Sequence, residues 1–343
     1  MRVSDYNYIL PKSKIAQYPP AVRGESRLLV LNRANGELTD RHYGDIGDYL
    51  KAGDVLVIND TKVIKARLLA EDVIGKPVEL VLLEKHGRNE DRHRHKVLYR
   101  GRLSVGDKLR IGDSELVVEE TQEGGIASVS SADDLALLAD EQGKVPLPPY
   151  MKREATSEDE ARYQTVFAKE QGSVAAPTAS LNMTDELMAR LRAKGVCVCM
   201  LTLHVGLGTF LPIRSDNVEG HTMHSEYFEI PAETVSIIHS AKRNGNRVIA
   251  LGTTVARTLE YASGHIIAAN KPRMISGEAD IFIYPGYRFV LLDGLVTNFH
   301  APKSTVLMLA AAFADWENLN QAYAHALAHD YQFLSYGDSM LIL

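Results

Sequence analysis

The stretch 196–205 constrains the fold of this chain more than any other part of the sequence. Its ten residues carry almost no polar side chain until His204, and two glycines follow closely. Such a run is typical of a strand that is covered on both faces, as in a parallel sheet. A predicted helix precedes it, for which Thr184 is the expected N-cap and Gly195 the expected end. Because ligands of open α/β sheets bind at the carboxyl ends of strands, this junction is the first candidate for a site.

Strands alternate with helices on both sides of this stretch. Apolar segments predict further strands at 27–32, 54–58, 247–251, 281–284 and 289–296. Pro231 is expected at the first position of a helix, and Ser304 is expected to cap another. The alternation favours a mostly parallel sheet with helices on its faces.

The segment 62–145 has a different texture. Its short apolar stretches, separated by Gly or charged turns, lie at 78–83, 96–99, 108–111, 116–118 and 126–129. This spacing is typical of an antiparallel barrel. We therefore expect an α/β protein whose main domain, residues 1–61 and 150–343, has a mostly parallel sheet. A small antiparallel β-barrel domain, residues 62–149, is inserted into it.

Composition and charge limit the classes of function. The 343 residues are 45% hydrophobic and 24% charged, as is usual for globular proteins, and the longest apolar run, nine residues at 306–314, is too short to span a membrane. The first residues lack the apolar core of a signal peptide, and Cys197 and Cys199 are expected in the core, so a cytoplasmic location is expected. The net charge of -6 argues against a general nucleic-acid coat. Residues 85–110, however, hold nine Lys and Arg against three Asp and Glu. That surface suits a polyanion bound through its phosphates, and the alternative is a set of exposed hairpins that are merely rich in Lys and Arg.

Polar side chains follow several of the predicted core strands. They are Asn59 to Thr61, His204, Thr253 and Thr254 with Arg257, and the segment 298–303. Each group alone is explained by a turn or a helix cap. In a doubly wound sheet all of them would meet at one edge, which favours an active site with carboxylate, imidazole, hydroxyl and cationic groups.

Three other kinds of site fit the sequence less well. The VGLG segment at 205–208 lacks the third glycine of a dinucleotide-binding loop, and Pro212 stands where its helix would run. His221, His224 and Glu226 do not have a helical His-Glu-X-X-His spacing, so we expect hydrogen bonding or acid/base work from them and no metal. Ser173 lacks the pattern of a nucleophile elbow.

Ordered sequence blocks extend along nearly the whole chain. They are IAQ (15–17), SRLLV (26–30), NDTKVI (59–64), PLPPY (146–150), RYQTV (162–166), GSVAAPT (172–178), LHVG (203–206), GTF (208–210), MHSE (223–226), RTLE (257–260), DIFIYPGY (280–287), NFH (298–300), PKST (302–305) and SYGD (335–338). In content and order these blocks resemble the S-adenosylmethionine:tRNA ribosyltransferase-isomerase family of the queuosine pathway.

The resemblance implies a fold and a reaction. The fold would be an α/β domain interrupted by a small β-barrel. S-adenosylmethionine would be a co-substrate, and no cofactor would be needed. Its ribose would be transferred and rearranged onto 7-aminomethyl-7-deazaguanine at the tRNA wobble position. The products would be epoxyqueuosine-tRNA, adenine and methionine. The expected partner is a tRNA with a GUN anticodon, and the expected state is a monomer.

The resemblance also suggests roles for individual residues. A sulfonium acidifies the adjacent ribose methylene, so a positioned base could start the reaction, and His204 and Glu226 are the candidates. Asp60 and Arg257 complete the predicted catalytic set. The predicted substrate-binding residues are Asn59, Thr61, Ser173, Pro177, Thr178, Asn182, Gly206, Gly208, Thr209, His224, Thr253, Thr254, Glu278, Asp280, His300 and Lys303. Asp60, Glu278 and Asp280 would hold ribose hydroxyls or the methionine ammonium, and Arg257 or Lys303 its carboxylate. The predicted tRNA-binding residues are Arg92, Arg94, Lys96, Arg100 and Arg102.

The sequence departs from the family pattern in three motifs. Asn182 stands at a histidine position, Leu207 and Leu211 replace an alanine and an arginine, and Val255 lies in an altered TTSVR motif. All three motifs are expected to line the pocket. Two alternatives therefore stay open: a paralogue of the same fold with another nucleoside or donor substrate, and a catalytically silent tRNA-binding protein.

Overall fold

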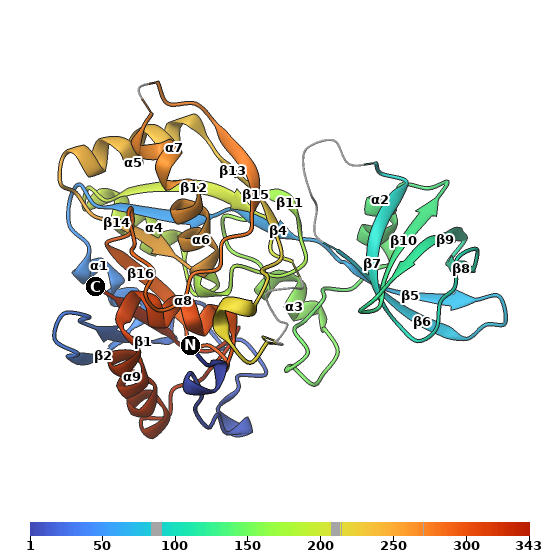
Figure 1. Cartoon of the computed structure of the whole chain (residues 1–343), viewed down its shortest axis with the longest axis horizontal. Helices are drawn as coiled ribbons and strands as arrows, with labels where there is room; N and C mark the ends of the chain where they lie inside the picture. Colours follow the sequence, from blue (N-terminus) through green and yellow to red (C-terminus); the bar gives the residue numbers. More distant parts are fainter. Residues whose placement is uncertain (84–90, 207–212, 214, 270) are drawn as a thin grey trace.

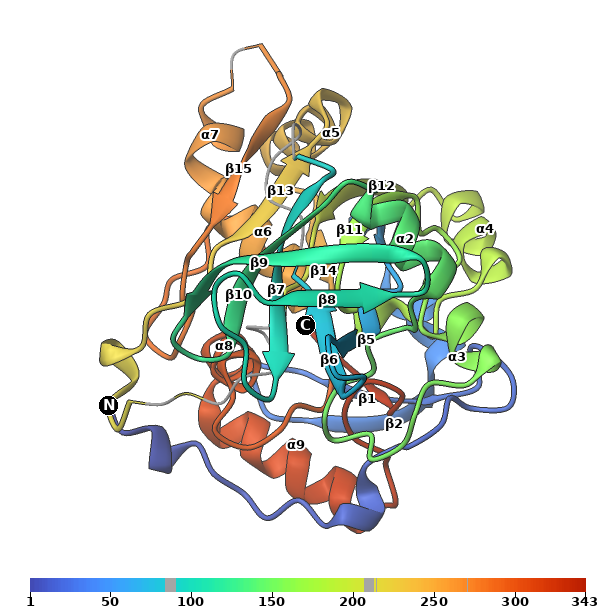
Figure 2. The ribbon, with the colours of Figure 1, turned by 90° about the vertical axis from the view of Figure 1, so that its right-hand side faces the viewer.

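The main body is built on a nine-stranded sheet, and a closed six-stranded barrel lies beside it (Figure 1). The computed structural model describes residues 1–83, 91–206, 213, 215–269 and 271–343. Figure 2 views the molecule from the barrel side, and both chain termini lie on the main body. No helix within the described ranges is long and apolar enough to cross a membrane.

The sheet has the strand order β15-β13-β12-β3-β14-β16-β17-β1-β2. Its strands are β1 (Arg27–Leu31), β2 (Leu38–His42), β3 (Val55–Asn59), β12 (Cys197–Leu203), β13 (Glu226–Ile230), β14 (Val248–Leu251), β15 (Ile275–Ala279), β16 (Gly294–Asn298) and β17 (Ser339–Ile342). Neighbouring strands are parallel from β12 through β3 and β14 to β16, and again between β17 and β1. The other pairs are antiparallel. The predicted α/β class with an inserted barrel is confirmed, with parallel pairing concentrated in the centre of a mixed sheet.

Helices cover both faces of the sheet. The helices of the described residues are α1 (Ile46–Tyr49), α2 (Leu135–Gln142), α3 (Ser157–Arg162), α4 (Asp185–Ala193), α5 (Ala232–Arg243), α6 (Thr253–Tyr261), α7 (Ser263–Ile267), α8 (Thr305–Ala314) and α9 (Trp316–Ala328). Of these, α2 packs in the barrel, and α3 lies between the barrel and β11 in sequence. Alternate residues of the strands pack against α1 and α4 on one face and against α5 to α9 on the other. Every residue of β3 and β14 is therefore buried, which is why these strands read as continuous apolar runs.

The barrel is antiparallel, with the order β10-β7-β6-β5-β8-β9. Its strands are β5 (Arg67–Asp72), β6 (Pro77–Leu82), β7 (Arg94–Arg100), β8 (Lys108–Ile111), β9 (Ser114–Gln122) and β10 (Ile126–Ser131). Outside both sheets, β4 (Thr61–Val63) pairs in parallel with β11 (Glu170–Ser173). The barrel has its own apolar core, to which α2 contributes. The predicted domain boundaries at 61/62 and 149/150 stay a prediction.

The predicted N-caps Thr184 and Ser304 are confirmed. The Thr184 hydroxyl accepts a hydrogen bond of 3.1 Å from the Leu187 amide, and the Ser304 hydroxyl one of 3.2 Å from the Leu307 amide. Pro231 is the N-cap of α5, one residue before the predicted position.

Two predictions about the sheet are wrong. Residues 281–284 are not a strand, and the edge strand is β15, whose sequence has little apolar character. The backbone carbonyl of Ile281 instead accepts a hydrogen bond of 3.3 Å from Arg257 Nε. Cys199 is buried as expected, but Cys197 is exposed because it begins β12 at the end of the sheet away from the site.

Candidate active site

A cavity of about 180 Å³ lies where β12, β14 and β16 end. Because these strands are parallel through β3, the segments that follow them meet at one edge of the sheet. The lining residues used below are Tyr150, Pro177, Thr178, Thr253, Thr254, Asn298, His300, Lys303 and Ser335. The cavity thus brings together six of the predicted substrate-binding residues, namely Pro177, Thr178, Thr253, Thr254, His300 and Lys303.

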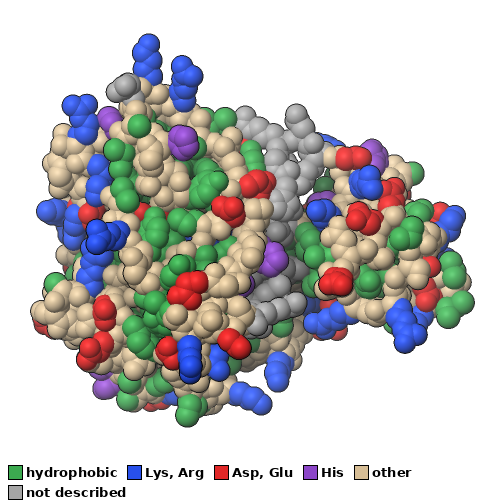
Figure 3. Space-filling model, in the orientation of Figure 1, with side chains coloured by type: hydrophobic (Ala, Val, Ile, Leu, Met, Phe, Trp, Pro, Cys, Tyr) green, Lys and Arg blue, Asp and Glu red, His purple; other side chains and the backbone are tan. Residues whose placement is uncertain are grey.

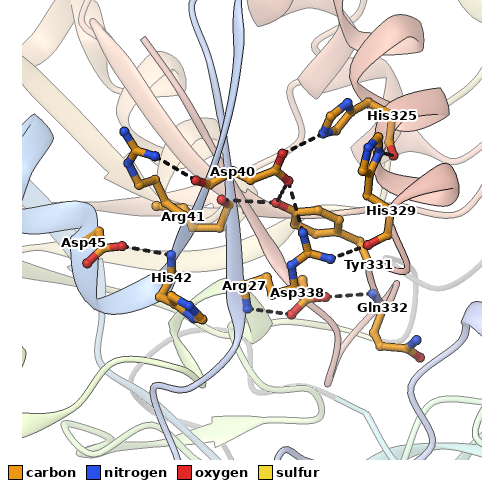
Figure 4. Close-up of polar contacts among 11 residues, drawn as sticks. Arg27, Asp40, Arg41, His42, Asp45, His325, His329, Tyr331, Gln332 and Asp338 are labelled. Atoms are coloured by element: carbon orange, nitrogen blue, oxygen red, sulfur yellow. Dashed lines mark hydrogen bonds and ion pairs between the residues drawn. The ribbon is translucent and has the colours of Figure 1, made fainter.

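A chain of hydrogen bonds supports one wall of this cavity. Thr178 donates from its hydroxyl to Asn298 Oδ1 at 2.8 Å, and Asn298 Nδ2 donates to the Asp338 carbonyl at 3.3 Å. The Asp338 carboxylate in turn accepts from the amides of Arg27 and Gln332, both at 2.7 Å (Figure 4). Asp338 therefore does not reach the cavity, but it ties the cavity wall to β1 and to the loop before β17.

The loop 298–304 is held from several sides. The backbone of His300 is fixed by two hydrogen bonds. Its amide donates to the Tyr323 hydroxyl at 2.9 Å, and its carbonyl accepts from the Tyr8 hydroxyl. His300 Nε2 is 2.7 Å from the Thr297 hydroxyl, and burial lowers the pKa of this imidazole to about 3. His300 is therefore neutral at pH 7 and offers hydrogen bonds rather than charge. Lys303, with φ of 59°, is the one charged residue among the described lining residues.

A second polar group lies next to the cavity, at the ends of β3 and β12. Asn59 is fully buried; its Nδ2 donates to the Leu203 carbonyl at 3.0 Å and to the Thr254 hydroxyl at 3.4 Å. His204 Nδ1 is 2.8 Å from the Thr61 hydroxyl, which fixes the orientation of the imidazole. Asp60 accepts from the Thr202 hydroxyl at 2.6 Å, and burial raises the pKa of its carboxyl.

Glu226 and Arg257 form a buried ion pair between β13 and α6. Their side chains are 3% and 7% exposed. Arg257 Nη2 also donates to the Ala279 carbonyl at 3.1 Å, and Glu226 Oε1 accepts from the Gly206 amide at 2.9 Å. Arg257 lines a second, small cavity that shares Thr253 and Thr254 with the first. The pair therefore borders the site and joins the strands around it.

The remaining predicted site residues lie elsewhere. The Ser173 hydroxyl donates to the Ala175 carbonyl and accepts from the Val205 amide, so it is engaged in hydrogen bonds that hold the backbone. Asn182 is 3% exposed, accepts from Ser26 Oγ at 2.8 Å and does not line the cavity. His224 and Asp280 are exposed, and Glu278 lies on β15 opposite Tyr227. Gly208 and Thr209 lie outside the described residues.

Two of the departing motifs do line the cavity, through Thr178, Thr253 and Thr254, but their changed residues do not. Asn182 belongs to a buried hydrogen-bond network with Ser26 and the Gly337 carbonyl. Val255 is fully buried in the core beneath α6. Leu207 and Leu211 lie outside the described residues. Two of the departures therefore change the support of the site rather than the lining of its cavity.

No group of three potential metal ligands gathers in the part of the chain that the structure describes. His221 packs edge-to-face on Phe282 with ring centroids 5.2 Å apart, while Glu226 faces Arg257. Two of the three residues considered as ligands, His221 and Glu226, thus contact different partners.

The predicted tRNA-binding residues lie on the barrel, where cations and carboxylates are interspersed (Figure 3). Arg92, Arg94 and Arg100 are within 3.2, 2.7 and 3.8 Å of Asp134, Glu119 and Glu79 respectively. Lys96 and Arg102 are exposed and have no ion pair among the described residues. Lys85 and Arg88 of the same segment lie outside those residues. In the described part of the segment 85–110, carboxylates therefore lie close to three of the predicted tRNA-binding arginines, so its surface is less uniformly basic than the sequence of the segment indicates.

Sequence reasoning missed Tyr150 and Ser335 as cavity residues. Their side-chain hydroxyls are hydrogen-bonded to each other, and burial raises the pKa of Tyr150 to about 12. Both stand in sequence blocks quoted above, PLPPY and SYGD, so the family pattern was the signal that could have indicated them.

Comparisons with known proteins agree along the whole chain. A family model described as "Queuosine biosynthesis protein" matches residues 3–342. An S-adenosylmethionine:tRNA ribosyltransferase-isomerase of Chlorobium phaeobacteroides is 54% identical, and one of Staphylococcus saprophyticus is 44% identical, each over 100% of both chains. The crystal structure of an S-adenosylmethionine tRNA ribosyltransferase from Thermotoga maritima, 34% identical, covers 99% of this chain and 100% of that chain with a TM-score of 0.57.

Proposed function

The chain belongs to the queuosine biosynthesis protein family, and on that premise we propose that it is an S-adenosylmethionine:tRNA ribosyltransferase-isomerase. The observation that carries this function is the identity of 54% over the full length of a relative with that name. The chain is thus an enzyme, a transferase and isomerase of tRNA modification, with S-adenosylmethionine and tRNA as its substrates.

The finer description of the reaction is also part of the proposal. The ribosyl group of S-adenosylmethionine moves to 7-aminomethyl-7-deazaguanine at the wobble position of a tRNA with a GUN anticodon. It is rearranged there, and adenine and methionine leave. The enzyme works as a cytoplasmic monomer without a cofactor.

The cavity is the proposed site for part of S-adenosylmethionine. Its volume of about 180 Å³ is below the roughly 300 Å³ at which sites for whole drug-sized ligands begin. Lys303 and the amides at the start of α6 and α8 border it, so they suit the methionine carboxylate. The neutral His300 and the hydroxyls of Thr178 and Thr254 supply hydrogen bonds to uncharged groups.

His204 is the proposed base that removes a proton from the ribose methylene beside the sulfonium. The Thr61 hydroxyl lies 2.8 Å from its Nδ1 and so holds the imidazole in one orientation at the end of β12, beside the cavity. Glu226 is less suited to this role because its carboxylate already forms an ion pair with Arg257. We assign Glu226 and Arg257 to holding the strands that surround the site.

A single-turnover assay tests this function. Protein, S-adenosylmethionine and tRNA that bears 7-aminomethyl-7-deazaguanine are mixed, and release of adenine is followed. The expected result is adenine only in the presence of that tRNA. His204→Ala should lose the release, whereas His265→Ala, which changes an exposed histidine of α7, should keep the wild-type rate.

The outcomes separate the two alternatives. No adenine with normal tRNA binding would point to a silent tRNA-binding protein, and adenine with a different tRNA base would point to a paralogue. Full turnover by His204→Ala would remove His204 as the base while leaving the reaction itself established.

A further inference from the structure

The outer face of β5, β6 and β7 carries a row of side chains that no role above uses. Arg67 pairs in register with Val81, and Val81 pairs with Leu98. Paired residues of neighbouring strands project to the same side, and the intervening Leu68 and Leu80 face the barrel core. Arg67, Val81 and Leu98 therefore face outward.

The adjacent row on the same face combines apolar and charged groups. Leu69 pairs with Glu79, and Glu79 pairs with Arg100. Leu69 is 68% exposed, which is unusual for a large apolar side chain. The outward face thus offers apolar surface directly beside two guanidinium groups.

The residues of the two rows other than Leu69, together with the connector 146–149, enclose a cavity of about 50 Å³, which we call the barrel notch. Its lining consists of Arg67, Glu79, Val81, Leu98, Arg100, Pro146, Leu147, Pro148 and Pro149. A cavity needs about 10–15 Å³ of such volume to hold one water, so the barrel notch has room for a group larger than a single water.

The charges of the barrel notch are incompletely paired. Arg67 Nε is buried and has no hydrogen-bond partner among the described residues, which is rare for a buried donor. Arg100 is 73% exposed, and its Nε is 3.8 Å from Glu79 Oε1, so this pair is loose. The carboxylate of Glu154 is engaged by Lys144 at 3.0 Å, and this contact, with a smaller effect of Arg67, lowers the pKa of Glu154. A buried donor without an acceptor and an excess of cations call for an anionic ligand.

The connector joins the barrel notch to the active-site cavity. Residues 146–149 line the barrel notch, and the next residue, Tyr150, lines the cavity of about 180 Å³. An extended polyanion with its reacting base at that cavity would pass along this connector. Guanidinium groups bind phosphates, and apolar side chains such as Leu69 suit the face of a ribose or base.

We propose that the barrel notch binds a backbone phosphate of the substrate tRNA, close in sequence to the modified nucleotide. Arg67 and Arg100 contact the phosphate, and Leu69 contacts the sugar or base attached to it. This inference rests on the proposed function and adds Arg67 and Leu69 to the tRNA-binding residues.

The test measures tRNA affinity of the full chain at several KCl concentrations, by filter binding with substrate tRNA. Arg67→Met and Arg100→Met should each weaken binding about tenfold and reduce the slope of log K against log salt by about 1. In steady state the KM for tRNA should rise while kcat stays at the wild-type value. Arg67→Lys, which keeps the charge, should retain the salt slope.

Matched controls make the result specific. Lys76→Met removes an exposed cation of the turn between β5 and β6, outside the barrel notch, and should leave tRNA affinity unchanged. Binding of S-adenosylmethionine should be equal in all variants. Circular dichroism melts check that each variant is folded.

The inference is overturned if Arg67→Met and Arg100→Met bind tRNA as tightly as Lys76→Met does. Inorganic phosphate is also added as a competitor of tRNA binding. The inference is overturned as well if Arg67→Met abolishes the effect of phosphate but keeps the wild-type tRNA affinity, since the ligand of the barrel notch would then be a free anion. A wild-type chain that releases adenine in either case leaves the proposed function standing. Absence of both adenine release and tRNA binding in the wild type would instead overturn the proposed function.

Discussion

The Glu226–Arg257 pair allows the sharpest test of how this site is built. Arg257→Met leaves a carboxylate that is 3% exposed without its partner, and it removes donors to the carbonyls of Ala279 and Ile281. Breaking a buried ion pair in this way costs about 3–5 kcal/mol. For 343 residues the unfolding entropy is about 0.7 kcal/mol/K, so Tm should fall by about 4–7 °C.

The Glu226→Gln variant and the double variant complete the experiment. If the two residues act as one structural pair, Glu226→Gln should lower Tm by a similar amount. The double variant should lose about as much as one single variant, a coupling of about 3 kcal/mol. Tm is measured by circular dichroism, and adenine release is measured with saturating substrates below the lowest Tm. A Glu226→Gln variant that keeps the wild-type Tm but loses all adenine release would refute this reasoning and make Glu226 the base.

Three further predictions concern the residues around the cavity. Burial lowers the pKa of His300 to about 3 in the folded chain, whereas in the unfolded chain it is about 6.5. As the pH falls below about 6.5, only the unfolded chain binds a proton at His300. The free energy of unfolding should therefore be about 2 kcal/mol lower at pH 5 than at pH 8. In His300→Gln this part of the pH dependence should vanish in urea titrations at the two pH values, and an unchanged profile would contradict the assignment. Thr61→Val should lower kcat about tenfold with little change in either KM, and Thr61→Ser should restore it, since the hydroxyl of Thr61 and not its methyl group contacts His204 Nδ1; equal rates in both variants would exclude this role. Lys303→Met should raise the KM for S-adenosylmethionine about tenfold, as expected for loss of a charge-assisted hydrogen bond, and equilibrium dialysis with S-adenosylmethionine alone checks whether binding itself is weakened.

Several features of the fold could be predicted because their signals are local. The buried strand β12 could be predicted from a continuous apolar run, and the starts of α4 and α8 from Thr184 and Ser304. The barrel could be predicted from short alternating segments between turns. β15 could not be predicted, because an edge strand paired on one side with β13 needs little apolar character.

The site was predictable in part. Residues directly after parallel strands, such as Thr254 and His300, follow from the rule that strand ends meet at one edge. Tyr150 and Ser335 reach the same cavity from a connector and a loop, to which no periodicity applies. The partner of Glu226 is likewise 31 residues away, and nothing local indicates Arg257 as its counter-ion.

The sequence by itself determined the α/β class, the inserted barrel, the positions of most strands and the family. These depend on hydrophobic periodicity, on capping residues and on ordered motifs, all of which are properties of short segments. Only the tertiary structure decided which polar residues share the cavity and which, like Asn182 and Ser173, are occupied by structural hydrogen bonds. It also decided that Arg67, which no sequence motif singles out, has a buried donor without a partner in the described part of the chain. The physical reason is that burial and hydrogen-bond partners arise from contacts between distant segments, which exist only once the chain has folded.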